Sequence, residues 1–240
     1  MKERLRILII IVSLPILLYI LSLTELQKYI PNLIKGGIVT IKVSVLGLIL
    51  FFIMSFLAGI ARGFFKGVIK WIAIIYIEIF RGTSLLVILF WLFFVLPEFG
   101  IFLSPLTAAV IGLGLNYGAY GAEVVRGAVK SVTKNQQEAA IALNMKPNKY
   151  LTRIVVPQVF VITIPGLTNL SMELIKGTSL VAGITISELT FAAMKLNGIF
   201  FKPIEVFGIA LLFYYFFAQF LRLISIYLED RFSIHLNREV

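Results

Sequence analysis

The chain has 240 residues, 60% of them hydrophobic and 14% charged, with a mean hydropathy of +0.99 and a formal net charge of +10. Globular proteins have roughly 45–50% apolar and about 25% charged residues, so this composition predicts an integral membrane protein without room for a separate soluble catalytic domain. Cysteine is absent and the one histidine is His235, which excludes disulfides and thiolate catalysis and predicts no metal site.

Six apolar stretches are long enough to predict membrane-spanning helices, each of which needs about 20 mostly apolar residues. They are residues 7–23, 38–61, 71–96, 106–125, 159–184 and 204–228. Between them we expect a loop with an interfacial helix over 24–37, a turn over 97–105 and a loop with some helical character over 185–203. The fold class is therefore all-α integral membrane, with about six transmembrane helices.

The first apolar stretch, residues 7–23, follows Lys2, Arg4 and Arg6. A basic flank and this length are also typical of a signal peptide. The small-residue cleavage pattern is missing, because residues 21–24 are Leu-Ser-Leu-Thr and have leucine where alanine is favoured. We interpret the stretch as an uncleaved first span, with a signal anchor that is later removed as the alternative.

Lysine and arginine are distributed unevenly between the two sides of the membrane. With the N-terminus inside, fifteen of the 22 basic residues fall in inner segments. Four fall in outer segments, namely Lys28, Lys35, Lys195 and Lys202. Because cytoplasmic loops carry an excess of lysine and arginine, this bias predicts that both termini and residues 126–158 are cytoplasmic. The positive net charge is then explained without a nucleic-acid partner.

Residues 126–158 form the only long polar segment. Thr133 with Gln136 fits a capping box, which predicts that a helix starts there. Asn144 can adopt the left-handed conformation that ends a helix. A first short helix is therefore expected between these residues.

A second short helix is predicted after this turn. Pro147 suits its first turn, and we expect it to run to Val156 before Pro157 breaks it ahead of the next span. Two short helices at a sharp angle would then lie across the membrane face. Their apolar residues could fill a partner's groove, or the two could be an ordinary interfacial helix pair.

The order Glu138-Ala139-Ala140, Asn144 and then Ile-Val-Val-Pro ending at Pro157 resembles the coupling loop of ABC importer permeases. That pattern is Glu-Ala-Ala, three residues, Gly, nine residues and Ile-x-Leu-Pro. The spacing matches, with Asn144 replacing the glycine and valine replacing the leucine before Pro157. Asparagine is the next-best residue for a left-handed helix end, so we expect the turn to be kept. The resemblance implies that Glu138, Ala139, Ala140, Asn144 and Pro157 couple the chain to an ATPase.

Other segments narrow the resemblance to the polar amino-acid permeases. Residues 77–87 are similar to one of their segments, with Ser84 where proline is usual. Residues 120–127 resemble the stretch leading into their coupling loop. Residues 176–190 resemble their Lys-Asp-Thr-Ser-Leu region, with Gly177 in place of the aspartate. The resemblance covers about residues 37–228.

This resemblance implies the five-helix core of a type I ABC importer plus an added N-terminal helix, with cytoplasmic coupling helices between spans four and five. We expect an N-terminal helix and interfacial segment over 1–36, a permease domain over 37–230 and a cytoplasmic tail over 231–240. The implied location is a prokaryotic cell membrane, which the chain crosses several times.

The resemblance also implies the partners of the chain. They are a cytoplasmic ABC ATPase dimer that binds the ATP, an extracellular or periplasmic amino-acid-binding protein, and a second permease subunit that is identical or related. The chain itself is then expected not to be an enzyme and to hold no cofactor.

Three pairs of opposite charge, each three residues apart, fall within or at the ends of spans: Glu78 with Arg81, Glu123 with Arg126, and Glu173 with Lys176. Charge inside a membrane is costly, and residues three apart on a helix can neutralise one another. We interpret the first two pairs as structural. For Glu173 two interpretations remain: a pair with Lys176, or a place in a central cavity where it meets a cationic group of the substrate.

Four further polar residues could line the same path. Asn169 precedes Glu173 by one helical turn, and Asn116 lies in the fourth span. Thr178 and Ser179 could contribute hydroxyls, although hydroxyls in membrane helices commonly bond their own backbone. The expected substrate-binding set is therefore these four residues with Glu173, and Glu173 favours polar, cationic amino acids.

The sequence contains no Gly-x-x-x-x-Gly-Lys-Ser/Thr phosphate loop, no His-Glu-x-x-His site and no Gly-x-Ser-x-Gly turn. If transport is driven by ATP, the ATPase is another chain. An intramembrane enzyme stays open as an alternative, although it needs catalytic residues beyond the paired charges. A secondary transporter also stays open, although that class often has internal repeats, which this sequence does not display.

Overall fold

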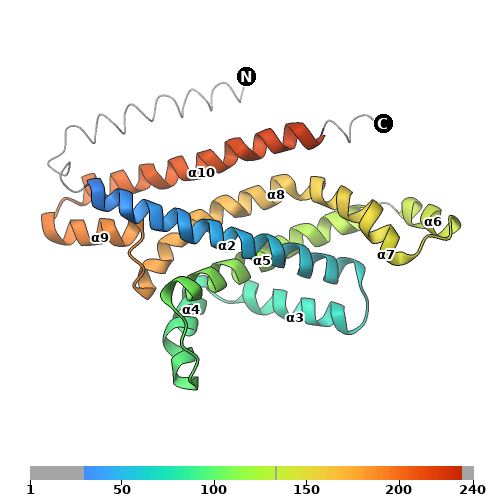
Figure 1. The fold of residues 1–240 in the computed structure, drawn as a ribbon, viewed down its shortest axis with the longest axis horizontal. Helices are drawn as coiled ribbons and strands as arrows, with labels where there is room; N and C mark the ends of the chain where they lie inside the picture. The colour runs from blue at the N-terminus through green and yellow to red at the C-terminus, as the bar shows by residue number, and fades with distance from the viewer. Residues whose placement is uncertain (1–29, 133, 234–240) are drawn as a thin grey trace.

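The computed structural model describes residues 30–132 and 134–233, and every regular element in this part of the chain is helical (Figure 1). The predicted first span lies outside it. The α-helices are α2 (Ile30–Phe64), α3 (Val68–Gly82), α4 (Leu85–Phe90), α5 (Pro105–Ser131), α6 (Lys134–Ala142), α7 (Pro147–Tyr150), α8 (Val156–Gly177), α9 (Leu189–Phe200) and α10 (Pro203–Ser233). The π-helical turns are η2 (Trp91–Val95) and η4 (Leu151–Val155), and the 3-10 helices are η3 (Leu96–Phe99) and η5 (Thr178–Ile184).

Helices α2, α5, α8 and α10 run along the long axis of the molecule (Figure 1). The contact between α2 and α5 is the most extensive, and α8 packs on both α5 and α10. α6 and α7 lie at one end of this bundle (Figure 1). α9 lies at the other end, where it packs on α2 and α10. The expected all-helical architecture is therefore confirmed.

Three helical stretches in the described part are long and apolar enough to cross a membrane: Ile30–Phe64, Pro147–Ile184 and Pro203–Ile224. α3 and the following residues 85–99 form a bent pair that could be a fourth. α5 has 27 residues, or about 40 Å at 1.5 Å per residue, which exceeds a hydrocarbon core of about 30 Å. Its many glycines and its tyrosines make it less apolar, which suits a helix surrounded by other helices.

α2 begins earlier than the sequence predicts. Residues 30–37, which we expected in a loop with an interfacial helix, form its first two turns, and Pro31 fits there because the first turn needs no N–H. Gly36 is buried, and a methyl group on it would lie 3.0 Å from the Glu188 carbonyl oxygen and from Leu189 Cα. Gly36 is therefore part of a helix, and it permits close packing of α2 on the start of α9.

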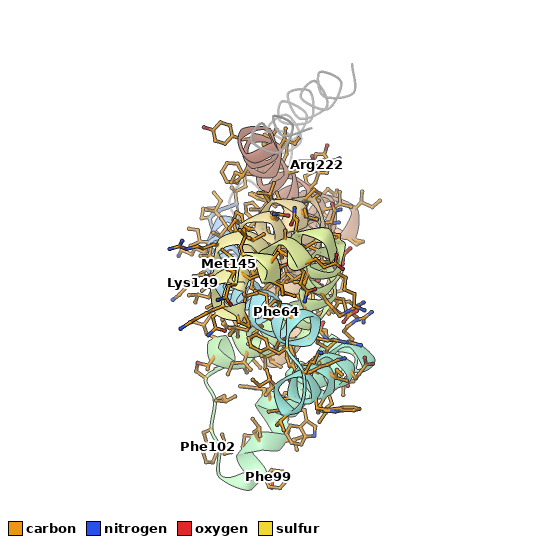
Figure 2. All side chains as sticks on the ribbon, turned by 90° about the vertical axis from the view of Figure 1, so that its right-hand side faces the viewer. Phe64, Phe99, Phe102, Met145, Lys149 and Arg222 are labelled. Carbon is orange, nitrogen blue, oxygen red and sulfur yellow. The ribbon has the colours of Figure 1, made fainter. Side chains whose placement is uncertain are left out.

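The expected continuous span over 71–96 is wrong. α3 ends at Gly82, and the chain turns by 103° into residues 85–99. Thr83 and Ser84 have extended backbones, and short hydroxyl residues after a glycine favour such a break because they bond the backbone outside helices. Residues 85–104, here called the arm, project from the side of the bundle. Figure 2 shows Phe99 and Phe102 at the tip of the arm, away from the rest of the molecule.

Pro157 does not break the helix, contrary to expectation. α7, η4 and α8 follow one another directly, and Pro147–Ile184 forms one stretch of 38 residues. A proline has no N–H to donate and its ring crowds the carbonyl four residues earlier, here that of Arg153. Arg153 lies in the π-helical turn η4, where the wider backbone accommodates the ring.

Small residues bring α2 and α5 together. A methyl group on Gly59 would lie 2.5 Å from Val125 Cβ and 2.7 Å from the Ala122 carbonyl oxygen. Gly114 of α5 faces Leu50 of α2 in the same way. Close approach through small residues is typical of packed membrane helices. The main hydrophobic core follows this contact and extends through α8 to the end of the bundle that holds α6 and α7.

Candidate functional site

The two short helices between α5 and α8 meet at a left-handed residue. Asn144 has φ 52°, two residues after α6 ends. The Met145 N–H donates to the Ala140 carbonyl and the Asn144 N–H donates to the Ile141 carbonyl, both at 2.9 Å. This pair of bonds is a Schellman motif, which satisfies the last carbonyls of α6. The predicted turn is confirmed, with Pro147 in the first turn of α7. The predicted cap, Thr133, lies outside the described residues.

One face of the α6–α7 pair is fixed to the bundle. Ala140 and Tyr150 are 4% and 8% exposed and belong to the main core. The Tyr150 ring lies 6.2 Å from the ring of Phe64, at the end of α2. Gln158 Nε2 of α8 donates to Gln136 Oε1 of α6 at 3.2 Å. The pair is therefore held at a defined position on the end of the bundle.

The opposite face of the pair is open. Ile141 and Leu143 are 67% and 79% exposed, and Glu138 and Ala139 are exposed beside them. Pro157 is also exposed, in the first turn of α8. This face combines a carboxylate with two large apolar side chains, which is the composition of an amphipathic helix that enters a groove on a partner. Of the five expected coupling residues, only Ala140 is buried.

Four charged side chains from three helices form a cluster near the end of α2. Arg62 Nη1 lies 2.6 Å from Glu123 Oε1 and 3.3 Å from Glu78 Oε1. Arg126 Nη2 lies 2.8 Å from Glu123 Oε2. The expected pair of Glu123 with Arg126 is confirmed. Two positive and two negative groups neutralise one another here, so the cluster ties α2, α3 and α5 together without a net charge.

The expected pair of Glu78 with Arg81 is wrong. Glu78 pairs with Arg62 of α2 instead, because the packing of α2 on α3 brings that guanidinium within reach. The Arg81 guanidinium lies over the ring of Tyr120, with 5.4 Å between its central carbon and the ring centroid. The face of the ring attracts the cation and takes the place of a carboxylate.

Asn169 and Glu173 lie one turn apart on an exposed stripe of α8. Within the described residues, Glu173 forms no ion pair, either with Lys176 or with any other cation. Its backbone carbonyl accepts a hydrogen bond from the Tyr117 hydroxyl at 3.0 Å. A methyl group on Gly177 would lie 2.5 Å from that hydroxyl oxygen, so the glycine at this position gives Tyr117 its space.

Lys176 contributes to a different part of the molecule. With Ser179, Tyr214 and Arg222 it lines a pocket of about 530 Å³ between α8 and α10, which Glu173 does not line. Lys176 and Glu173 are thus directed to different surroundings although they are three residues apart. Of the two interpretations of Glu173, pairing with Lys176 is the one that this geometry does not support.

Two of the expected lining residues are enclosed by the fold. Asn116 is 4% exposed, and its Nδ2 donates to the Phe80 carbonyl at 2.6 Å. Thr178 is 0% exposed, and its hydroxyl donates to the Ile175 carbonyl at 2.6 Å. Both side chains use their polar groups within the chain. The accessible members of the expected substrate-binding set are therefore Asn169, Glu173 and Ser179.

Glu188 stands at the junction of three helices, and sequence reasoning did not select it as a site residue. Its carboxylate is 0% exposed. Oε2 accepts from the Tyr214 hydroxyl of α10 at 2.6 Å and from the Thr40 hydroxyl of α2 at 3.3 Å. Oε1 accepts from the Phe191 N–H at 2.9 Å, which caps α9. The carboxylate thus joins α2, α9 and α10.

A signal for Glu188 is present in the sequence. It is the only acidic residue between Glu173 and Glu205, in a stretch that is otherwise largely apolar. Glutamate is not among the preferred N-cap residues, so helix-start rules do not select it. The rule that an acidic residue in an apolar segment needs a reason would have selected it.

A family of known transporters matches the part of the chain that contains these features. The family is described as "Binding-protein-dependent transport system inner membrane component", and it matches residues 55–233. The chain belongs to this family. The match begins in the second half of α2 and includes the charged cluster, the α6–α7 pair and Glu188. The permease is therefore an inner membrane component of a transport system, as the resemblance implied.

Individual relatives agree with this assignment. The permease is 43% identical over 209 residues to the probable amino-acid ABC transporter permease protein y4tF of Sinorhizobium fredii, covering 83% of the permease and 88% of that protein. It is 36% identical to the L-cystine transport system permease protein TcyB of Bacillus subtilis, covering 81% and 83%. It is 34% identical to the glutamine transport system permease protein GlnP of Escherichia coli, covering 85% and 94%. These relatives are transport proteins, which confirms that the permease is not an enzyme.

Solved structures share the fold. An amino acid ABC transporter crystallised with histidines matches with a TM-score of 0.78 and 28% identity, covering 86% of the permease and 97% of that chain. The inward-facing MetNI methionine ABC transporter matches with a TM-score of 0.74 at 14% identity, covering 88% and 99%. The second likeness concerns the fold alone. Together they confirm the type I ABC importer fold expected from the resemblance.

Proposed function

We propose that this permease is the membrane-spanning subunit of an ATP-driven importer for polar amino acids. The observation that carries the proposal is the α6–α7 pair, fixed on one face and open on the other, in a chain similar to amino-acid permeases. Relatives named for glutamine and cystine support the amino-acid class. An enzyme or a secondary transporter has no comparable support.

The α6–α7 pair is the contact with a cytoplasmic ATPase dimer. Glu138 supplies a carboxylate, and Ile141 and Leu143 supply apolar surface that a groove on the ATPase would cover. The Schellman turn at Asn144 fixes the angle between the helices. Nucleotide-driven movement of the groove then moves α8, because α7, η4 and α8 are one continuous helical stretch.

The end of the bundle that carries α6 and α7 faces the cytoplasm, together with both termini. Exposed lysines support this orientation: Lys66 follows α2, Lys130 is in the last turn of α5, and Lys146 and Lys149 flank the start of α7. Cytoplasmic segments are enriched in such residues. α9 and the start of α2 then lie at the extracellular end.

The substrate path follows the exposed stripe of α8. Asn169 and Glu173 face outward from this chain, and a second permease subunit would close the stripe into a cavity. A carboxylate in a closed cavity needs a cation, and Glu173 has no ion-pair partner within the described residues. A positively charged amino-acid side chain supplies one, so the favoured substrates are cationic.

Reconstitution tests this function. The permease is co-expressed with an ABC ATPase from the same genome, purified through a tag on the permease and placed in liposomes with the binding protein. We expect the ATPase to co-purify and amino-acid uptake to require both ATP and the binding protein. A non-hydrolysable ATP analogue in the same liposomes is the control. Uptake driven by an ion gradient without ATP would instead establish a secondary transporter.

A further inference from the structure

A pocket of about 520 Å³ lies between the first turns of α2 and α9, at the end of the bundle opposite α6 and α7. Its polar lining consists of Asn32 and Lys35 from α2, and Ser187 and Lys195 from α9 and the residues just before it. None of the described residues that line the pocket is acidic. The pocket thus presents two ammonium groups and two neutral polar groups, a composition suited to a carboxylate.

Both lysines are available to a ligand. Lys35 and Lys195 are exposed, and no ion pair within the described residues involves either of them. Among the residues that the structure describes, the nearby carboxylate of Glu188 is not directed to the pocket, because Glu188 is 0% exposed and bonded to Tyr214 and Thr40. Both lysine ammonium groups are therefore available to pair with an external anion.

The two walls of the pocket are fixed relative to one another. The close approach at Gly36 leaves no space for a side chain between α2 and α9. The Thr40 hydroxyl accepts from the Leu189 N–H at 3.1 Å, and Glu188 caps α9 through the Phe191 N–H. Lys35 and Lys195 thus stand on a rigid frame, which reduces the entropy lost when a ligand binds.

The position of the pocket along α2 indicates where the ligand comes from. α2 has 35 residues and is about 52 Å long, whereas the hydrocarbon core of a bilayer is about 30 Å. The turns that carry Asn32 and Lys35 precede the apolar stretch 38–61, so they are the part that extends beyond the membrane. Just past the pocket residue Ile199, Phe201 and Ile204 are 83% and 86% exposed. Exposed apolar residues beside a polar site are typical of a protein interface.

We propose that this pocket is a docking site for the substrate-binding protein and that it receives an acidic side chain of that protein. This inference rests on the proposed function, since the family depends on a binding protein and the orientation places the pocket outside the cell. The carboxylate lies between Lys35 and Lys195, while Phe201 and Ile204 cover the apolar margin of the contact. A rigid, two-point electrostatic contact of this kind fixes the orientation of the partner and accelerates its association.

The test uses the complete importer in liposomes of neutral lipid and measures ATP hydrolysis against the concentration of substrate-loaded binding protein. The double variant Lys35→Gln/Lys195→Gln removes both charges and keeps the side chains polar. Lys42→Gln is the matched control, because Lys42 is an exposed lysine of the same helix, two turns further on, that does not line the pocket. Each protein is measured at about 50 and about 300 mM salt, since salt screens exposed charges.

In the double variant we expect the half-saturating concentration of binding protein to rise by about tenfold, which corresponds to 1.4 kcal/mol, with an unchanged maximal rate. Its salt dependence should become weaker, and Lys42→Gln should behave like the unsubstituted importer. An unchanged concentration dependence in the double variant would overturn the inference.

Two further outcomes would indicate either a different ligand for the pocket or a failure of the proposed function. If the double variant differs from the unsubstituted importer only in liposomes that contain anionic lipid, the pocket binds a lipid headgroup and the docking proposal is wrong. If the unsubstituted importer is not stimulated by any binding protein, the proposed function itself fails.

Discussion

The buried carboxylate of Glu188 is expected to stabilise the fold by a measurable amount. Removing this carboxylate by Glu188→Ala leaves the Phe191 N–H without its acceptor and removes one partner of the Tyr214 hydroxyl, which still lies 3.0 Å from Thr190 Oγ1. A buried polar group without a partner costs about 1–3 kcal/mol. We expect Glu188→Ala to lower the free energy of unfolding by about 2–4 kcal/mol. Thermal unfolding in detergent measures the effect as a lower Tm.

Two other variants complete this prediction. Glu188→Gln keeps one carbonyl oxygen as an acceptor, so its Tm should lie between those of Glu188→Ala and the unsubstituted protein. Glu98→Ala should leave the Tm unchanged, because Glu98 is exposed on the arm. Equal Tm values for the Glu188→Ala and Glu98→Ala variants would contradict the role assigned to the buried carboxylate.

Glu173 is the residue that we propose to govern substrate preference. Glu173→Gln keeps the shape of the side chain and removes its charge, so arginine should lose a charged partner that glutamine never used. We expect uptake of arginine to fall by at least about tenfold relative to uptake of glutamine, since hydrogen bonds to charged groups contribute about 1.5–3 kcal/mol. Competition between the two radiolabelled amino acids in liposomes measures this ratio. Equal losses for both substrates, or unchanged arginine uptake, would make Glu173 a structural residue.

The angle between α6 and α7 depends on the left-handed backbone of Asn144. A β-branched side chain there costs about 1–2 kcal/mol, whereas glycine costs none. We expect Asn144→Val to reduce the amount of ATPase that co-purifies and Asn144→Gly to leave it unchanged. Asn148→Val is the control, because Asn148 lies in α7 with an ordinary right-handed helical backbone. Normal co-purification with Asn144→Val would show that the angle is not essential.

Helix positions were largely predictable from apolar length, while breaks and continuations were not. The lengths of the apolar stretches locate α2, α5, α8 and α10. They treat α3 and residues 85–99 as one span, because hydropathy holds no information about the direction of the chain. Pro157 predicts a break that the π-helical turn η4 removes. Residues 24–37 were expected to form a loop with an interfacial helix, yet Gly36 lies within α2 at a close contact with α9 that only the tertiary structure reveals.

The candidate site was predictable to a different extent at each position. Local rules identified the Asn144 turn, because a left-handed helix end depends on neighbouring residues alone. The partner of Glu78 lies 16 residues away on α2, and the partners of Glu188 lie on α2 and α10, so spacing along one helix could not find them. Asn116 was expected to line a path, but its amide bonds the backbone of α3.

The orientation of the permease in the membrane can be tested directly because the chain has no cysteine. Ser131→Cys and Gly198→Cys place single thiols at opposite ends of the bundle. Both positions are exposed, and a side chain on Gly198 meets no atom within 4 Å. In intact cells, an impermeant thiol reagent should label Gly198→Cys and not Ser131→Cys, and both should react after lysis. Labelling of Ser131→Cys from outside would reverse the topology.

We propose that the exposed face of the α6–α7 pair couples this permease to an ATPase. Glu138→Lys tests it most directly, because it reverses a charge on that face without touching the buried Ala140 and Tyr150. The measurement is ATP hydrolysis by the reconstituted importer with and without substrate-loaded binding protein, and Glu98→Lys makes the same change on the arm as a control. We predict that Glu138→Lys loses the ATPase subunit or its stimulation, while binding of the binding protein from outside and the behaviour of Glu98→Lys remain normal. Normal transport together with normal stimulation in Glu138→Lys would show that this face does not couple the permease to the ATPase.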